Sequence, residues 1–202
     1  MKKQSTILLV LFAMTSLLFT KCNSKGEEEK KAPASAVASN TTGGYETPEK
    51  WGEHLVTIAG CGDCHTPKKM TPAGPVENDS LMLSGHPAKA PYPDVNRKDM
   101  QGKGYIVTND LTAWVGPWGV SFTANLTPDP ATGTGNWKEG QFITAIREGK
   151  YHGLEGSRPL LPPMPWQKYK NFSNDELKAI FAFLRTVNPI SNAVPPPLPP
   201  VQ

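Results

Sequence analysis

Cys61-Gly62-Asp63-Cys64-His65 is the stretch that decides the fold of this 202-residue chain. Its C-x-x-C-H spacing is the attachment signature of a c-type haem. Two thiols at this separation can form thioether bonds to the two vinyl groups of one porphyrin. The imidazole of His65 follows at once and lies where it can supply the proximal ligand to the iron. We therefore predict one covalent haem c, held by Cys61, Cys64 and His65.

Two other uses of a C-x-x-C pair have less support in the surrounding sequence. A thioredoxin-like dithiol needs a β-α-β context, which the flanking segments do not provide. A four-ligand zinc site usually brings a second pair of Cys or His ligands, and the only other cysteine is Cys22. Metal binding and an incidental match are the alternatives to haem attachment.

The first 21 residues resemble an export signal in composition. Two lysines precede a mostly apolar run from Ile7 to Phe19, which is short for a transmembrane helix and typical of a signal-peptide core. Cys22 follows as in a bacterial lipobox, although Lys21 stands where a small residue is usual. We expect residues 1–21 to be a lipoprotein-type signal peptide and Cys22 to be lipidated. An ordinary cleaved signal with an incidental cysteine is the alternative.

Removal of this signal changes the charge of the chain. The whole sequence has a net charge of +3, and the first 21 residues carry three lysines and no acid. The mature chain is therefore expected to have no net charge, which removes the main support for a nucleic-acid or anionic-membrane partner. Residues 22–46 are polar and are expected to be a flexible tether. The expected location is the periplasm, the outer membrane or the cell surface of a bacterium.

An amphipathic helix is expected directly before the haem motif. Thr47 and Pro48 supply an N-cap and a proline at the first helical position. Gly60 ends the helix just before Cys61. The apolar stripe of this helix is expected to consist of Trp51, Leu55 and Ile58.

Two further helices are expected towards the C-terminus. Asn136 is the expected N-cap of one, with Glu139 completing a capping box, and Gly149 is its expected end. The last helix begins with the capping box of Ser173 and Glu176 and ends before Pro189. The residues expected to be buried on these helices are Phe142, Ile143, Ile146, Leu177, Ile180, Phe181 and Leu184.

Residues 66–135 are expected to form an ordered, loop-rich insertion, because a structureless loop of this length is unusual in a compact domain. Short extended pieces are expected at Tyr105–Val107 and Val120–Thr123. Trp114 and Trp118 are expected to pack over the haem edge as apolar anchors.

The C-terminal segment contains Pro195-Pro196-Pro197-Leu198-Pro199-Pro200. This composition favours polyproline II, and we expect a stiff, exposed end, with partner binding as the alternative. The expected organisation is a signal peptide (1–21), a tether (22–46), a haem domain (47–190, with the insertion at 66–135) and a proline-rich tail (191–202).

The sixth ligand decides whether a haem transfers electrons or binds small molecules. Met164 lies in Pro162-Pro163-Met164-Pro165-Trp166, where the prolines restrict the backbone and lower the entropy cost of holding the sulfur in place. We predict Met164 as the distal ligand, with a gap-filling core methionine as the alternative. Other donors that stay open are Met70, Met82, Met100, His54, His86 and His152; the histidines are expected to be surface or hydrogen-bonding residues, with His152 the main competitor.

Several stretches together resemble a known family: Cys61–Lys68, Asn125-Leu126-Thr127-Pro128-Asp129 with Thr132–Gly135 and Trp137, Phe142–Lys150, and Pro162–Trp166. The chain is similar over most of residues 47–190 to the bacterial cytochrome c family that includes the haem-c subunits of membrane-bound alcohol and gluconate dehydrogenases. The resemblance implies a mainly α, class I cytochrome c fold with crossing terminal helices. It also implies that Met164 is the distal ligand.

The dehydrogenase subunits of that family carry several C-x-x-C-H motifs, whereas this chain has one. We therefore expect a mono-haem, lipid-tethered electron carrier with redox proteins as partners, and not an enzyme. One alternative is a haem that binds or reacts with peroxide, nitric oxide or carbon monoxide through an open sixth position. Another is a structural or binding lipoprotein in which the C-x-x-C-H motif is incidental.

Overall fold

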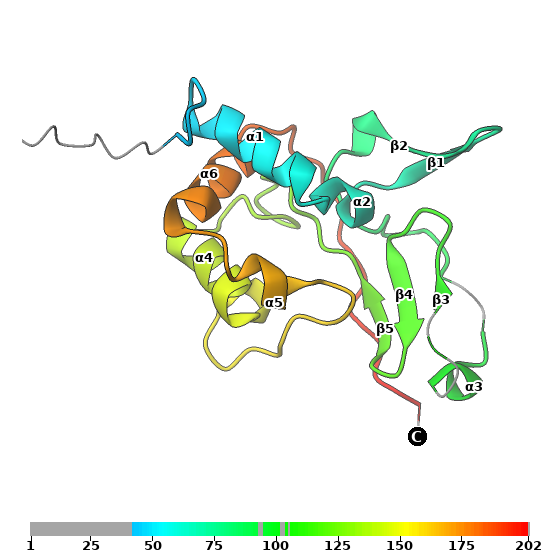
Figure 1. Cartoon of the computed structure of the whole chain (residues 1–202). Coiled ribbons are helices and arrows are strands. Elements are labelled where there is room, and N and C mark those ends of the chain that lie inside the picture. The colour runs from blue at the N-terminus through cyan, green and yellow to red at the C-terminus, as the bar shows by residue number, and fades with distance from the viewer. Residues whose placement is uncertain (1–41, 93–94, 102–103, 105, 202) are drawn as a thin grey trace, which may run out of the picture. The chain divides into compact units, whose positions relative to one another are not determined.

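The computed structural model describes residues 42–92, 95–101, 104 and 106–201, without the side chains of Met100 and Gln101. The expected signal, Cys22, most of the tether and Tyr105 lie outside the described residues. Helices and a three-stranded sheet gather on opposite sides of the short helix α2 (Figure 1). The elements are α1 (Pro48–Ile58), α2 (Cys61–His65), β1 (Lys68–Thr71), β2 (Gly74–Glu77), η1 (Asp79–Leu81), α3 (Arg97–Gln101), β3 (Ile106–Val107), β4 (Ala113–Gly116), β5 (Gly119–Phe122), α4 (Glu139–Glu148), η2 (Tyr151–Gly153), α5 (Trp166–Tyr169) and α6 (Asn174–Leu184).

Helices α1 and α6 form the main helical contact (Figure 1). Both begin as their local sequence predicts. The hydroxyl of Thr47 accepts a hydrogen bond from the amide of Lys50 at 3.2 Å, and Ser173 and Glu176 form the reciprocal capping box. The expectation that the first and last helices of the domain meet agrees with this contact.

The closeness of α1 and α6 depends on Gly52. A Cβ atom at this position would lie 1.9 Å from the carbonyl oxygen of Ala179 and 2.8 Å from Cβ of Phe183. No rotamer change relieves a clash with backbone, so any side chain here must separate the helices. Gly52 therefore sets the distance between α1 and α6.

The core lies between these helices and α4. The four residues predicted to be buried on α6 are all buried, and Phe142 is buried on α4, with Ile143 and Ile146 partly buried against the same core. The expectation for Ile58 is wrong, because its side chain is 64% exposed. Gly52, Leu55 and Val56 form the buried face of α1 at spacings of three and four, and this face points away from Ile58.

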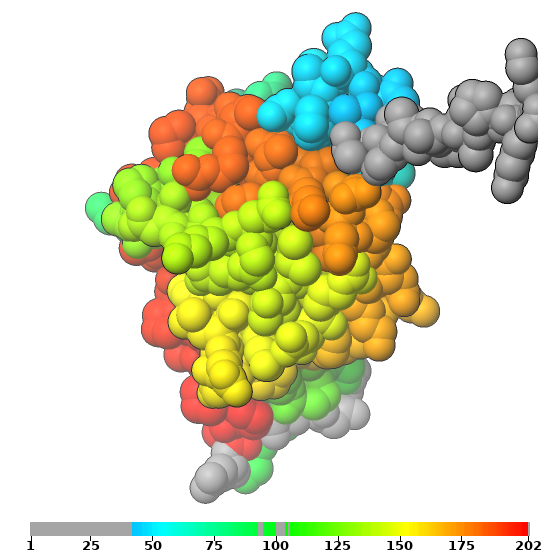
Figure 2. Space-filling view, turned by 90° about the vertical axis from the view of Figure 1, so that its left-hand side faces the viewer, coloured from blue at the N-terminus to red at the C-terminus, as the bar shows by residue number. Residues whose placement is uncertain are grey.

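The start of α4 differs from the sequence prediction. Its N-cap is Lys138, which makes no side-chain capping bond, so the expected cap at Asn136 is wrong. The side-chain amide of Asn136 instead donates to the carbonyl oxygen of Pro130 at 2.8 Å. The predicted end at Gly149 is confirmed, with φ 63° in the left-handed region. Figure 2 shows the surface of α4 (yellow-green) and the segment after it (yellow) beside the orange chain of α5 and α6.

The insertion contains two antiparallel sheets. Strands β1 and β2 form a hairpin in which Lys68 lies opposite Glu77, and β3, β4 and β5 form a sheet in that order. Extended structure at Val107 and from Val120 to Phe122 agrees with the sequence prediction. The described residues thus combine helices with sheets that the mainly α expectation did not contain. None of the described helices is long and apolar enough to cross a membrane.

The proline-rich tail is fastened to the folded part at Asn192 and Leu198, while its last described residues, Pro199, Pro200 and Val201, are exposed. Leu198 exchanges two backbone hydrogen bonds with Val120 on β5, at 2.9 and 3.0 Å. Leu198 can do so because, unlike the prolines around it, it has an N–H group. The side chain of Asn192 donates to the carbonyl oxygens of Ser84 and His86 and accepts from the amide of Ala88.

Replacement of Gly52 by valine is expected to destabilise the protein by at least about 3 kcal/mol, because α1 must move away from α6. The measurement is the free energy of unfolding in denaturant. Gly140→Ala on α4 is the control, since a Cβ atom there meets nothing within 4 Å. We expect that change to be neutral or to stabilise by up to about 1 kcal/mol. Equal effects of the two substitutions would contradict the role of Gly52.

Asn192→Ala is expected to lower the free energy of unfolding by about 1–3 kcal/mol, because it leaves backbone groups of the 84–88 segment without their partners. The exposed Asn188 provides the matched control, and Asn188→Ala is expected to stay within about 0.5 kcal/mol of the wild type. A loss no larger than that of the control would show that the Asn192 contacts contribute nothing to stability.

Candidate haem-binding site

The C-x-x-C-H motif forms helix α2, which follows α1 after a turn at Gly60. Gly60 has φ 66°, a conformation that favours glycine. Cys61 and Cys64 lie three residues apart on this helix and are both partly buried. Burial raises the pKa of Cys61 to about 11 and also raises the pKa of Cys64, with smaller effects of nearby charges.

These surroundings fit haem attachment better than a zinc site. A zinc ligand is a thiolate, and burial here disfavours the charged thiolate. A thioether sulfur carries no charge and is suited to an apolar position. In addition, across the described ranges no three His, Cys, Asp or Glu side chains lie together in a way that could hold a metal ion.

The imidazole of His65 is oriented by a long-range hydrogen bond. Its Nδ1 lies 2.7 Å from the carbonyl oxygen of Ala124. A carbonyl oxygen only accepts, so Nδ1 carries the proton and Nε2 keeps its lone pair. Burial lowers the pKa of His65, and this effect outweighs the hydrogen bond to Ala124, which acts in the opposite direction. The ring is therefore held as the neutral tautomer that an iron ligand requires.

Two loops fix the Ala124 carbonyl and the motif helix together. The amide of Gly85 donates to the carbonyl oxygen of His65 at 2.8 Å, and the amide of His86 donates to that of Thr123 at 2.9 Å. Gly85 has φ 75°, and a Cβ atom there would lie 2.5 Å from the carbonyl carbon of Ala124. This close approach explains why glycine occupies the position.

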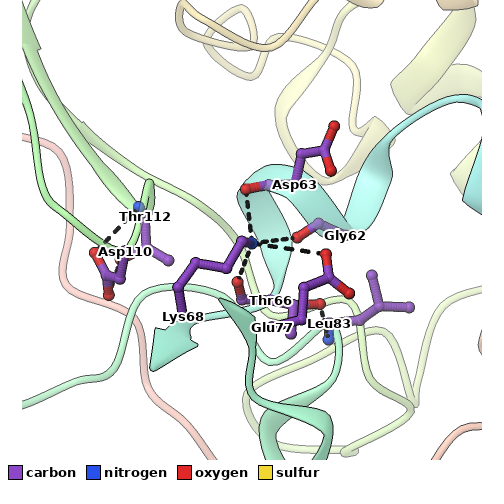
Figure 3. Close-up of polar contacts among 8 residues, drawn as sticks. All are labelled: Gly62, Asp63, Thr66, Lys68, Glu77, Leu83, Asp110 and Thr112. Atoms are coloured by element: carbon purple, nitrogen blue, oxygen red, sulfur yellow. Dashed lines mark hydrogen bonds and ion pairs between the residues drawn. The ribbon is translucent and has the colours of Figure 1, made fainter. Parts of the chain in front are cut away.

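The side chain of Lys68 caps the C-terminal end of α2 (Figure 3). Its ammonium donates to the carbonyl oxygens of Gly62, Asp63 and Thr66 at 2.8, 2.8 and 2.6 Å. The carboxylate of Glu77 lies 3.7 Å away. The sequence analysis did not single out Lys68, although a cation just after a short helix is a known partner for its last carbonyl groups.

The Met164 segment lies beside α5, and the region around it is hollowed. A hollow of about 310 Å³ is lined by Leu160, Gln167, Lys168 and the Pro162–Trp166 block. The hydroxyl of Ser121 on β5 donates to the carbonyl oxygen of Pro162 at 2.6 Å, which ties this block to the sheet. The pairing of Met164 with His65 across one haem stays a prediction.

Tyr169 links the Met164 segment to the motif helix. Its hydroxyl donates to the carbonyl oxygen of Ala59 at 2.5 Å, two residues before Cys61. Burial raises the pKa of Tyr169 to about 12, with smaller contributions from Cys61, Cys64 and Asp63. The residue five positions after Met164 therefore contacts the chain just before the C-x-x-C-H motif. Sequence reasoning missed this contact because it joins residues 110 positions apart.

The other candidate ligands have different surroundings. His86 is fully buried, with Nδ1 2.8 Å from the hydroxyl of Thr112 and Nε2 3.3 Å from the carbonyl oxygen of Ala90, which confirms it as a hydrogen-bonding residue. The hydroxyl of Thr112 in turn donates to Asp110 (Figure 3). His152 is exposed and stacks on Tyr151 with ring centroids 3.9 Å apart.

The remaining candidate iron ligands lie at the surface or have side chains outside the described residues. His54 is exposed and packs against the ring of Tyr45, with centroids 5.1 Å apart. Met70 and Met82 are 62% and 40% exposed. The side chain of Met100 lies outside the described residues.

Comparison with known proteins gives relatives among the cytochrome subunits of dehydrogenases, although no family model matches the sequence. The fructose dehydrogenase cytochrome subunit of Gluconobacter japonicus is 25% identical over 186 residues, 91% of this chain and 29% of that protein. The gluconate 2-dehydrogenase cytochrome c subunit of Pantoea cypripedii is 33% identical over 78 residues, 38% of this chain and 17% of that protein. The cytochrome c subunit of the quinone-dependent alcohol dehydrogenase of Gluconobacter oxydans is 32% identical over 76 residues, 37% of this chain and 15% of that protein.

These findings confirm the resemblance inferred from the motifs: the homologues include cytochrome c subunits of dehydrogenases. The chain spans less than a third of the length of each relative named.

The raised pKa of Tyr169 predicts a loss of stability in alkali. The pKa of Tyr169 is 10.0 in the unfolded chain and about 12 in the folded protein. Its contribution to the free energy of unfolding is therefore complete below pH 10.0 and is lost as the pH rises through about 12. The difference in free energy of unfolding between wild type and Tyr169→Phe should therefore shrink between pH about 9 and about 12. Unfolding in denaturant across this range tests it, and a constant difference would contradict it.

Proposed function

We propose that this chain is a one-electron carrier of the bacterial cell envelope, with one haem c bound covalently by Cys61 and Cys64. His65 and Met164 are the proposed axial ligands. The observation that carries the proposal is the hydrogen bond from Nδ1 of His65 to the carbonyl oxygen of Ala124. This bond leaves the lone pair of Nε2 available to bind iron, on the residue directly after the second cysteine. The relatives named as cytochrome subunits of dehydrogenases support the same function.

When bound, the haem supplies a ferric/ferrous couple that exchanges one electron at a time. The residues of the chain set the conditions for this exchange. The Gly85 and Ala124 contacts hold the imidazole of His65 in one orientation. The prolines around Met164 and the Ser121–Pro162 hydrogen bond restrict the distal segment, so a weak thioether donor is held without a large entropy cost.

The proposed partners are redox proteins that donate and accept the electron. A lipid at Cys22 and a flexible tether at residues 22–46 would keep the haem domain close to its membrane while it meets them. The single C-x-x-C-H motif in this sequence favours a mono-haem carrier over a dehydrogenase subunit with several haems. We propose no catalytic role for the domain.

Absorption spectra of the purified, exported protein test the proposal. Haem should stay with the polypeptide after denaturation, because thioether bonds are covalent. The ferric form should show the weak far-red band of a methionine–iron bond, and carbon monoxide should not change the spectrum of the ferrous form. Ready uptake of carbon monoxide by the wild type would instead support the gas-binding or peroxide-binding alternative.

Met164→Ala is expected to remove the far-red band, to allow carbon monoxide to bind and to lower the midpoint potential. Met70→Ala is the matched control, because Met70 lies five residues after His65 in the sequence and its side chain is 62% exposed. That variant should keep the spectrum and potential of the wild type. An unchanged Met164→Ala spectrum, or a loss of the band in Met70→Ala, would assign the distal ligand elsewhere.

A further inference from the structure

The ammonium group of Lys68 is almost completely enclosed next to the motif helix. The side chain is 8% exposed. An ammonium has three N–H donors, and here three backbone carbonyl oxygens accept from it, those of Gly62, Asp63 and Thr66. Figure 3 shows the Lys68 side chain reaching the end of α2 from strand β1. The charge is therefore held at one place in the site.

This positive charge is only partly balanced. The three carbonyl groups are dipoles without formal charge. Glu77 is the acid that pairs with Lys68 within the described part of the chain, and its side chain is 46% exposed. Their separation of 3.7 Å is longer than a hydrogen bond. Solvent therefore screens the charge of Glu77 more than it screens the charge of Lys68.

Lys68 lies directly against the residues that are proposed to hold the haem. Its ammonium donates to the carbonyl oxygens of Gly62 and Asp63, the two residues between Cys61 and Cys64. It also donates to the carbonyl oxygen of Thr66, the residue after His65. The charge is therefore fixed at the turn of chain that carries all three proposed haem-binding residues.

We propose that Lys68 raises the reduction potential of the haem by fixing a nearly buried positive charge at the C-terminal end of the C-x-x-C-H helix. This inference rests on the proposed function. Reduction adds one electron, delivered by a redox protein, and lowers the charge of the iron centre by one. A fixed positive charge nearby disfavours the more positive ferric state, and low solvent exposure strengthens the effect. Lys68 thus acts on the iron through its field.

Substitutions on both sides of the Lys68–Glu77 pair test this inference through midpoint potentials of the haem-loaded protein. Lys68→Met keeps the length of the side chain and removes the charge. We expect it to lower the ferrous-to-ferric ratio, measured at a fixed ambient potential, about tenfold. For a one-electron couple this corresponds to a midpoint potential that is about 59 mV lower. Glu77→Gln removes the compensating charge and should shift the ratio the other way by a smaller amount.

Lys69→Met is the matched control, because Lys69 is the next residue on β1 and is exposed. Solvent screens its charge, so the ratio should change by less than about twofold. Lys68→Arg keeps the charge and should stay closer to the wild type than Lys68→Met.

A purely structural role for Lys68 predicts a different pattern. Both Lys68→Met and Glu77→Gln would then weaken the same contact and shift the potential in the same direction or leave it unchanged. Opposite shifts support the electrostatic role, and equal signs or no shift overturn it. If Lys68→Met fails to fold or to retain haem, Lys68→Gln replaces it, because its amide can still donate hydrogen bonds to the carbonyl oxygens while the charge is removed. Failure of the proposed function is a separate result, since the wild type itself would then lack covalent haem or a reversible one-electron couple.

Discussion

The hydrogen bond between His65 and Ala124 is the constraint on which the rest of the site depends. It joins residues 59 positions apart, one on the motif helix and one just after β5. The carbonyl direction sets both the tautomer and the rotation of the imidazole ring. Any shift of the 123–125 segment would therefore turn the proposed proximal ligand. The insertion, which looks like an appendage in the sequence, supplies the groups that orient His65.

The segment after α6 holds the same loops in place. The side chain of Asn125 donates to the carbonyl oxygen of Ile190 at 2.8 Å, and the hydroxyl of Thr127 accepts from the amide of Ile190 at 3.1 Å. Asn192 then binds the 84–88 segment from the other side. The fully buried Thr127 and nearly buried Asn125 are thus satisfied, as buried polar groups must be. This gives a physical reason for the Asn-Leu-Thr-Pro-Asp block that contributed to the family resemblance.

Sequence reasoning succeeded where a structure depends on near neighbours in the chain. The caps at Thr47 and Ser173 and the buried stripe of α6 follow from residues within one or two turns. It failed at Asn136, because Pro130 competes for the side chain, and it did not predict the pairing of Leu198 with Val120, because that is a long-range contact. The candidate site residues Cys61, Cys64 and His65 stand out by their spacing in the sequence, whereas the Ala124 carbonyl that orients His65 carries no local signal.

The cap at the end of α2 shows how stability and redox properties can depend on one residue. A short helix leaves its last carbonyl groups without partners, and Lys68 satisfies three carbonyls of this turn. An amide side chain can also donate hydrogen bonds, so capping alone does not require a cation. Enclosing an ammonium costs several kcal/mol unless dipoles or an opposite charge offset it. The carbonyl groups and Glu77 provide that offset, and the charge that they stabilise then acts on any iron held by His65. A chain with no net charge in its expected mature form can therefore still carry an enclosed positive charge beside its C-x-x-C-H helix.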